Sequence, residues 1–338
     1  MAISTTSPAL DGAGPAAARR RRHYLAGIAL ATCGAALFSA KAIVVKLAYR
    51  HGVDAVTLIA LRMLFAVPWF ALALVAARRG RPALVRGDHL RLVAIGVIGY
   101  YAASFLDFLG LQHVSAGLER LVLYLAPTIV LLLSVVVLRQ PVTRRDVAAL
   151  LLSYGGIALV VHHDVNLAGD GVALGVLLVF GSAVCYAIYL VGAGAMVRRV
   201  GAIRLTSYAM CVATVACVAQ FLALRPLAAL RLPPAVYGLS LFNGILCTVV
   251  PVFATMLAVE RIGAGSAALA GNVGPVATIV FGYLLLGEPI GAWQLAGTAL
   301  VLLGVFVLAG RRPAPRPTPA AGLAAIAAHH PIQPRTLP

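Results

Sequence analysis

The feature that most constrains this chain is a succession of long apolar runs. A helix crosses the bilayer's hydrocarbon core, about 30 Å thick, with roughly 20 apolar residues. With 62% hydrophobic and only 11% charged residues, the chain has too little polar surface to cover a globule in water. The sequence therefore predicts an all-α integral membrane protein with ten transmembrane helices, near residues 24–44, 56–77, 90–109, 116–138, 146–161, 171–192, 204–224, 236–258, 265–286 and 291–309.

Two segments lie outside these runs. Residues 1–18 and 313–338 are rich in Ala, Pro, Ser and Thr without a periodic apolar face, which predicts disordered tails. The first run follows Arg19–Arg22 and no small-residue cleavage pattern clearly ends it, so we expect it to remain as the first helix.

The positions of Lys and Arg predict the orientation. The formal net charge of +17 would suggest nucleic acid in a soluble protein, but here the arginines lie between apolar runs, and no nucleic-acid partner is expected. Nineteen basic residues fall in segments on the side of the N-terminus, and four fall on the other side, namely Lys46, Arg50, Arg225 and Arg231. Since basic segments stay in the cytoplasm, we expect a multi-pass protein of the cell membrane, in bacteria the inner membrane, with both termini cytoplasmic.

The chain also repeats itself. Residues 116–156 align without gaps onto 264–304 at a shift of 148, which matches Pro127 with Pro275 and Pro141 with Pro289. Each half, residues 24–161 and 171–309, then holds five helices, and an odd number makes the halves cross the membrane in opposite senses. The sequence thus predicts two inverted five-helix repeats, an architecture typical of secondary transporters.

These segments resemble the drug/metabolite transporter superfamily, and specifically its EamA-type members. The resemblance is carried by the helices with Pro127 and Pro275, by LRQP (138–141) and LGEP (286–289), and by KLAYRHGVDAVTLIALRMLF (46–65). The first helix departs from the family pattern, with Phe38, Ser39, Ala40 and Lys41 where Trp-Gly, a small residue and Asn are frequent. The resemblance implies a ten-helix exporter of amino acids, other metabolites or drugs that works by alternating access.

Five ionisable residues lie inside the runs, where charge is costly and therefore a sign of function. They are Lys41, Arg62, Asp107, Glu119 and Arg120. All five are expected within roughly 10 Å of the outer surface, at 1.5 Å per residue. Three interpretations stay open: a substrate site or gate, a static salt-bridge network, and side chains that reach separately to the headgroups.

The second half replaces these charges with neutral residues. At the same shift Lys41 corresponds to Tyr189, Asp107 to Thr255, and Glu119 to Ala267. Neutral candidates for the substrate site are Tyr124, Tyr189, Asn243 and Asn272, although packing or anchoring at the membrane interface is the favoured interpretation of each tyrosine. Pro127 and Pro275 are expected to kink their helices.

The sequence holds no phosphate-binding GxxxxGK[ST] loop, HExxH helix, nucleophile elbow or ligand-spaced Cys and His. We therefore expect no enzyme, no cofactor and no metal, and a carrier driven by a substrate or ion gradient. Proton coupling, if present, would use Asp107 or Glu119, the only carboxylates inside the runs.

The leading hypothesis is a transporter, secondary active or facilitative, that exports a small charged or zwitterionic metabolite across the lipid bilayer. The five charges sum to one positive charge, which favours a substrate that carries an acid group. The alternatives are a polytopic membrane enzyme acting on lipid and a passive channel.

Overall fold

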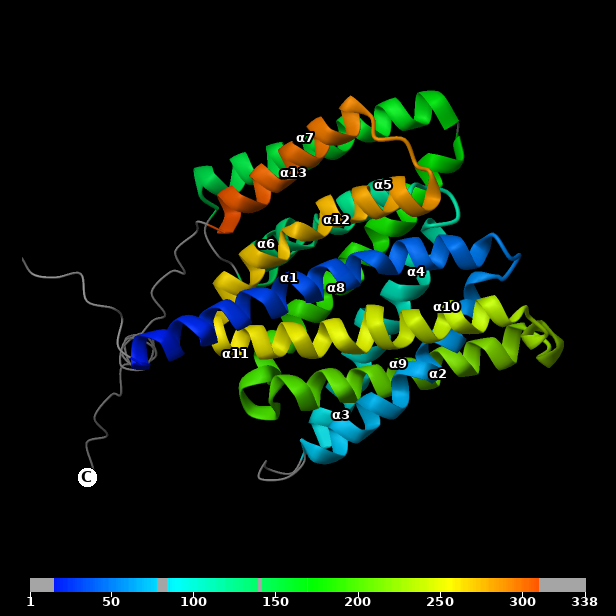
Figure 1. The fold of residues 1–338 in the computed structure, drawn as a ribbon, viewed down its shortest axis with the longest axis horizontal. Helices are drawn as coiled ribbons and strands as arrows, with labels where there is room; N and C mark the ends of the chain where they lie inside the picture. Colours follow the sequence, from blue (N-terminus) through cyan, green and yellow to red (C-terminus); the bar gives the residue numbers. More distant parts are fainter. Residues whose placement is uncertain (1–14, 78–83, 85, 139–141, 169, 310–338) are drawn as a thin grey trace, which may run out of the picture.

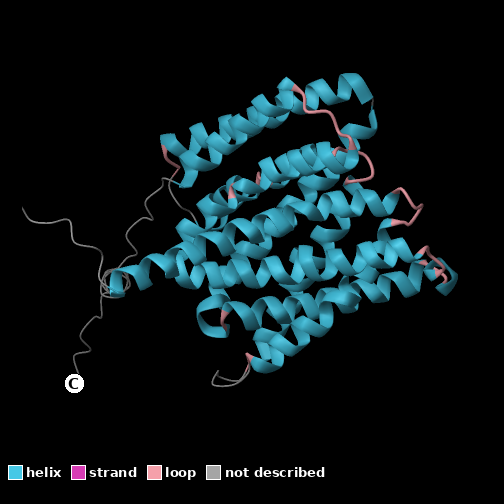
Figure 2. Ribbon diagram, viewed as in Figure 1, coloured by secondary structure: helices cyan, strands magenta, loops and turns pink. Residues whose placement is uncertain are grey.

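The computed structural model describes residues 15–77, 84, 86–138, 142–168 and 170–309. Within these residues the chain forms helices joined by short loops, with no strand (Figures 1 and 2). The helices run back and forth along one direction, and the start of the first and the end of the last lie at the same end of the bundle (Figure 1). We call this the termini end, and the end that holds the α1–α2 turn the far end.

The helices of the first half follow the predicted runs closely. Asp54 caps α2 by accepting hydrogen bonds from the backbone N–H groups of Val56 and Thr57, and Ser115 caps α5 in the same way at Leu118. The elements are α1 (Pro15–Tyr49), α2 (Ala55–Ala76), α3 (Arg86–Gly96), η1 (Val97–Ala102), α4 (Ala103–Gly110), α5 (Ala116–Leu123), α6 (Ala126–Leu138) and α7 (Arg144–Ala168).

The second half has the same order of elements. Gly263, with φ of 79°, interrupts α11 and separates the two apolar runs on either side of it. The elements are α8 (Asp170–Val200), α9 (Ala202–Leu224), the short η2 (Leu227–Leu230), α10 (Pro234–Gly244), η3 (Ile245–Val249), α11 (Val250–Gly271), α12 (Val273–Phe281), η4 (Gly282–Leu286) and α13 (Ala292–Ala309).

Length and composition make this a multi-pass membrane protein. Among the described residues, eight helices are long and apolar enough to cross a bilayer, and Val273–Leu286 and Ala292–Leu308 are shorter apolar helices. Large apolar side chains such as Leu72, Val136 and Leu151 are 65–76% exposed on the bundle's surface. Such a surface is stable against lipid rather than water.

Three segments differ from the sequence prediction. Residues 15–18, predicted as part of a tail, open α1, because proline is favoured at the first helical position and the three alanines that follow are strong helix formers. Residues 162–168, predicted as a loop, continue α7. The ninth predicted run, 265–286, is divided at Asn272. The predicted tails 1–14 and 313–338 lie outside the described residues.

Pro127 and Pro275 mark breaks in their helices. The first break lies at Tyr124 and Leu125, between α5 and α6, and the second at Asn272, between α11 and α12. Each begins three residues before its proline, because proline has no N–H for the carbonyl four residues earlier and its ring crowds that carbonyl. Tyr124 (φ −70°, ψ −3°) and Asn272 (φ −64°, ψ −6°) adopt nearly the same conformation.

Wide helical turns also recur between the halves. The π-helical turns η1 and η3 begin at Val97 and Ile245, which are related by the shift of 148. Each π turn connects the helix before it, α3 or α10, to the helix after it, α4 or α11. A π turn inserts one residue into a helix and is common at functional sites.

Close contacts between helices recur in the same way. A Cβ atom at Gly27 would lie 2.4 Å from Ile262, and one at Gly175 would lie 2.6 Å from Val114. Adding 148 to residues 27 and 114 gives residues 175 and 262. The same relation links α7 and α13, where a Cβ at Gly156 would lie 2.7 Å from the Gly297 carbonyl oxygen and one at Gly304 2.8 Å from that of Ala149. Helices of one half therefore pack on helices of the other.

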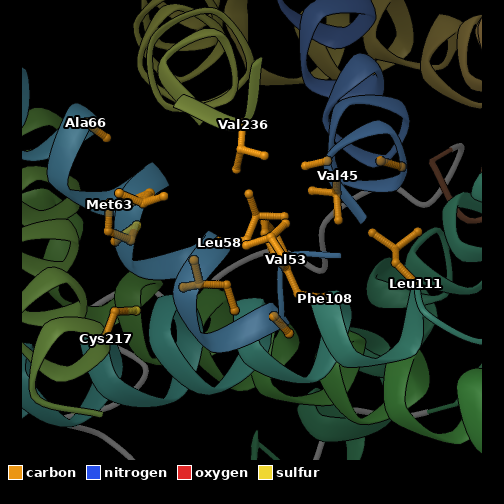
Figure 3. Packing of buried hydrophobic residues seen from close by; sticks show 14 of the residues in the cluster. Val45, Val53, Leu58, Met63, Ala66, Phe108, Leu111, Cys217 and Val236 are labelled. Carbon is orange, nitrogen blue, oxygen red and sulfur yellow. The ribbon is translucent and has the colours of Figure 1, made fainter. Parts of the chain in front are cut away.

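The largest apolar core lies toward the far end. Val45 of α1, Leu58 and Met63 of α2, Phe108 of α4 and Val236 of α10 point toward one another (Figure 3). This core holds together the helices that carry most of the predicted charges.

Candidate functional site

Four of the five predicted intramembrane charges form one buried cluster. The Lys41 Nζ lies 2.5 Å from Asp107 Oδ2 and 3.2 Å from Glu119 Oε1, and Arg120 Nε lies 4.0 Å from Glu119 Oε2. Each of the four residues is at most 5% exposed. The charges come from α1, α4 and α5, so helices far apart in sequence share one ionic centre.

Arg120 connects this centre to the second half. Its Nε donates to the Thr278 hydroxyl of α12 at 3.2 Å, and its Nη2 donates to the Phe38 carbonyl of α1 at 2.9 Å. The Phe38 ring lies 5.1 Å from the Arg120 guanidinium and 5.4 Å from the Lys41 Nζ, within cation–π range of both. Phe38, Ser39 and Thr278 were not among the predicted site residues.

The second helix break is held by side chains of the first half. The Tyr124 hydroxyl donates to the Gly271 carbonyl at 2.9 Å, and the Ser39 hydroxyl donates to the Gly274 carbonyl at 2.9 Å. The Gly271 carbonyl is the one that Pro275 leaves without its helical partner, since it lies four residues earlier. Tyr124 thus compensates in one half for a proline in the other.

Arg62 lies nearby but outside the ion pairs. Its Nη2 donates to the Ser104 hydroxyl at 3.0 Å, and its guanidinium lies 5.0 Å from the Phe108 ring. Its Nε has no hydrogen-bond partner in the described part of the chain, and no carboxylate of that part lies within 4.0 Å of it. A buried guanidinium without a carboxylate partner retains the capacity to bind an anion.

The cluster's carboxylates also keep unused capacity. Asp107 Oδ1 and both Glu119 oxygens make no hydrogen bond to any described residue, although Glu119 Oε1 faces the Lys41 ammonium. Buried charges are expensive unless they are fully paired and hydrogen-bonded. Two carboxylates that share one ammonium ion could therefore accept a proton or a cationic group, while Arg62 could accept an acid group.

Among the described residues, the side chains of the other three neutral candidates make no hydrogen bond to the ionic centre. The Tyr189 hydroxyl accepts from the Tyr100 hydroxyl at 3.3 Å and lies 3.4 Å from Thr206, and its ring packs on those of Tyr100 and Tyr186. Asn243 is fully buried on α10, and neither amide atom has a hydrogen-bond partner among the described residues. Asn272 lies at the second helix break and is half-buried.

A second group of polar residues at the far end was missed by the sequence analysis. The Glu288 carboxylate accepts from the Ala116 backbone N–H at 3.0 and 3.1 Å and pairs with the Lys46 Nζ at 3.0 Å. With Tyr49, Arg50 and Leu286, these two side chains line a pocket of about 430 Å³. The sequence signal was the acidic residue of LGEP, a motif that the sequence analysis used only as a mark of the family resemblance.

Comparisons with known proteins agree with this architecture. The model of the EamA-like transporter family matches residues 25–162 and 173–310. The chain is 31% identical to the uncharacterized transporter YcbK of Bacillus subtilis, over 86% of this chain and 93% of the relative. It is 28% identical to an uncharacterized transporter of Archaeoglobus fulgidus, over 76% and 89%. A solved crystal structure, 17% identical, shares the fold with a TM-score of 0.57 over 83% of this chain and 95% of the other.

The apolar helices and these relatives define a multi-pass membrane transporter. The chain belongs to the EamA-like transporter family.

Proposed function

We propose that this protein is a secondary carrier that exports a small charged or zwitterionic metabolite by alternating access. The observation that carries the proposal is the buried ionic centre of Lys41, Asp107, Glu119 and Arg120. It joins three helices of one half and contacts α12 of the other through Thr278. A charge network at the junction of two halves can change its pairing when the halves move, which a carrier requires.

The proposed architecture is ten membrane crossings in two inverted five-helix repeats, 24–161 and 171–309. It is supported by the recurrence of η1 in η3, of the proline breaks, and of the glycine contacts at one shift. Contacts that pair residues of one half with residues of the other in both directions are those of a pseudo-twofold axis. Such an axis gives a carrier two related states of similar energy, one open to each side.

The proposed orientation puts both termini in the cytoplasm, so that the far end faces outward. Its support is the asymmetry of basic residues along the sequence. A reporter fused after Asp164 should then read as external. A cytoplasmic reading would reverse the orientation and place the ionic centre nearer the cytoplasmic side.

Substrate charge follows from the groups that keep binding capacity. The guanidinium of Arg62 would bind an acid group, and Asp107 or Glu119 a cationic group or a coupling proton. A purely cationic drug would meet three cations against two carboxylates, and we expect it to be excluded.

Efflux from proteoliposomes tests the proposal. Amino acids, organic acids and a cationic dye should be compared with and without an imposed pH gradient. A carrier accelerates counterflow when unlabelled substrate is placed on the opposite side, whereas a channel does not, and a lipid product would indicate an enzyme. Transport of the dye alone would refute the charge argument.

A further inference from the structure

The loop after η4 reaches from the second half to the first at the far end. Gly287, with φ of 72°, adopts a left-handed conformation that ends the helix, and the Glu288 N–H donates back to the Gly282 carbonyl. This geometry fixes where the Glu288 side chain begins, and directs it to the first half.

Two helix ends and three charges meet there. Glu288 accepts from the first N–H of α5 at Ala116 and pairs with Lys46 of α1, which also donates to the Val114 carbonyl at 2.8 Å. Beside it, Arg50 Nη2 donates to the Leu286 carbonyl at the end of η4, at 2.9 Å. Each charge is opposite in sign to the partial charge of the helix end that it contacts, so these bonds stabilise one another. We name these contacts of Lys46, Arg50 and Glu288 the far-end latch.

The latch lies directly beyond the ionic centre on the same helices. Lys46 follows Lys41 by five residues on α1, and Ala116 precedes Glu119 by one turn on α5. Five residues correspond to about 7.5 Å along a helix. A path from the buried charges to the far side must therefore pass the latch.

The corresponding residues at the termini end cannot make the same ion pair. At the shift of 148, Lys46 corresponds to Gly194 and Glu288 to Gln140, neither of which carries a charge. The ion pair of Lys46 and Glu288 therefore has no counterpart at the positions related to it by the shift.

We propose that the far-end latch is the gate of the carrier on that side, and that rupture of the Glu288 contacts opens the ionic centre to it. This inference rests on the proposed carrier function. The latch groups are partly exposed, with side-chain exposures of 25% for Lys46 and 17% for Glu288. Charge-assisted bonds near water are strong enough to bias a closed state and weak enough to break in each cycle.

The buried Cys247 thiol reports on the gate. It lies in η3, which packs against α1 and α2, and is 0% exposed. A membrane-impermeant maleimide should be added to the far side of the full-length protein in proteoliposomes, and the labelled cysteines identified by mass spectrometry. Because the Cys247 thiol is fully buried against the helix that carries Lys46, we expect its labelling rate to follow the population of the open gate.

We expect Lys46→Met and Glu288→Gln each to label Cys247 about tenfold faster than the unaltered protein, as for the loss of one charge-assisted contact. Glu288→Asp should remain closest to the unaltered rate. Glu260→Gln is the matched control, because Glu260 is exposed and has no ion pair among the described residues. Its Cys247 labelling should not change.

Two results would overturn the gate. Cys247 labelling could stay unchanged in both latch variants, or labelling could rise equally at all five cysteines, which would indicate general unfolding. Labelling needs no substrate, so this outcome is independent of counterflow. Counterflow with unchanged Cys247 labelling would refute the gate but not the carrier. Faster labelling without counterflow would refute the carrier but not the gate.

Discussion

The two halves of this protein share their packing and differ in their charges. Positions related by one shift make the same helix contacts, as Gly27 with Ile262 and Gly175 with Val114 do. Yet Lys41 is the hub of an ionic centre, while its counterpart Tyr189 packs among tyrosines. The difference indicates that the shared small-residue contacts do not depend on the charges, which the proposed function assigns to recognition or gating.

The largest loss of stability is expected when a charged residue of the first half is replaced by a neutral one, as at the related positions of the second half. Glu119→Gln leaves Lys41 and Arg120 with one carboxylate fewer in a buried site, at a cost of roughly 3 to 5 kcal/mol. Unfolding of the purified protein by denaturing detergent measures this loss. Glu260→Gln, on the exposed surface, should change stability by less than about 0.5 kcal/mol.

A combined variant separates stability from function. With Lys41→Met, Asp107→Asn, Glu119→Gln and Arg120→Met together, no charge of the ionic centre is left uncompensated, so most of the stability should return. Transport should stay lost if the charges act on substrate. A quadruple variant that transports normally would show that the ionic centre has no part in function.

The next effect tests the shared packing. Gly156→Ala and Gly304→Ala would each place a Cβ within 3 Å of a backbone oxygen on the opposite helix. Because the two sites are equivalent, both should destabilise by a similar amount, about 1 to 3 kcal/mol, as overpacked cores do. Gly155→Ala is the control, since nothing lies within 4 Å of its Cβ position.

The same unfolding assay measures all three glycine variants. Equal losses in the two related variants, with none in the control, would sharpen the comparison between halves. A loss in only one of the two would mean that the packing is less symmetric than the contacts indicate.

A smaller effect concerns the proline breaks, where the halves differ again. Tyr124→Phe removes the hydroxyl bound to the Gly271 carbonyl, and a lost buried hydrogen bond costs about 1 kcal/mol. Tyr283→Phe, at a side chain that is 56% exposed, should cost almost nothing. If the two variants unfold alike, the second break does not depend on Tyr124.

Local patterns in the sequence were sufficient for most of the helices and for the grouping of four charges. Apolar length located the helices, and residue counts from the nearest loop put Lys41, Asp107, Glu119 and Arg120 at one level, where the structure joins them. The prolines marked the helix breaks for a similar reason, since the missing N–H acts within four residues.

Contacts between distant segments were beyond such patterns. Glu288 meets Lys46 across 242 residues, and only the arrangement of the helices brings them together. Arg62 is buried, but its side chain is directed to Ser104 rather than to a carboxylate. Tyr189 lies with other tyrosines. In an inverted repeat, related residues such as Lys41 and Tyr189 are expected toward opposite ends of the bundle.

The smallest effect is expected at the caps of the second helix in each half. Asp54 caps α2 and pairs with Arg225 Nε at 3.1 Å, whereas α9 begins after Gly201 without a side-chain cap. Partial burial acts to raise the pKa of Asp54, but the hydrogen bonds from Thr57 and Arg225 outweigh it and hold that pKa below the usual 3.8. A carboxyl with a lowered folded-state pKa stabilises the protein above the usual pKa and loses this contribution as the pH falls through the lowered one.

Asp54→Asn keeps a good cap, so at neutral pH it should cost only a few tenths of a kcal/mol. Thermal unfolding of both proteins, measured from about pH 6 downward, should then show the difference between them vanish in acid. A difference that stays constant over this range would mean that the charge of Asp54 contributes nothing, and that the two halves begin their second helices on equal terms.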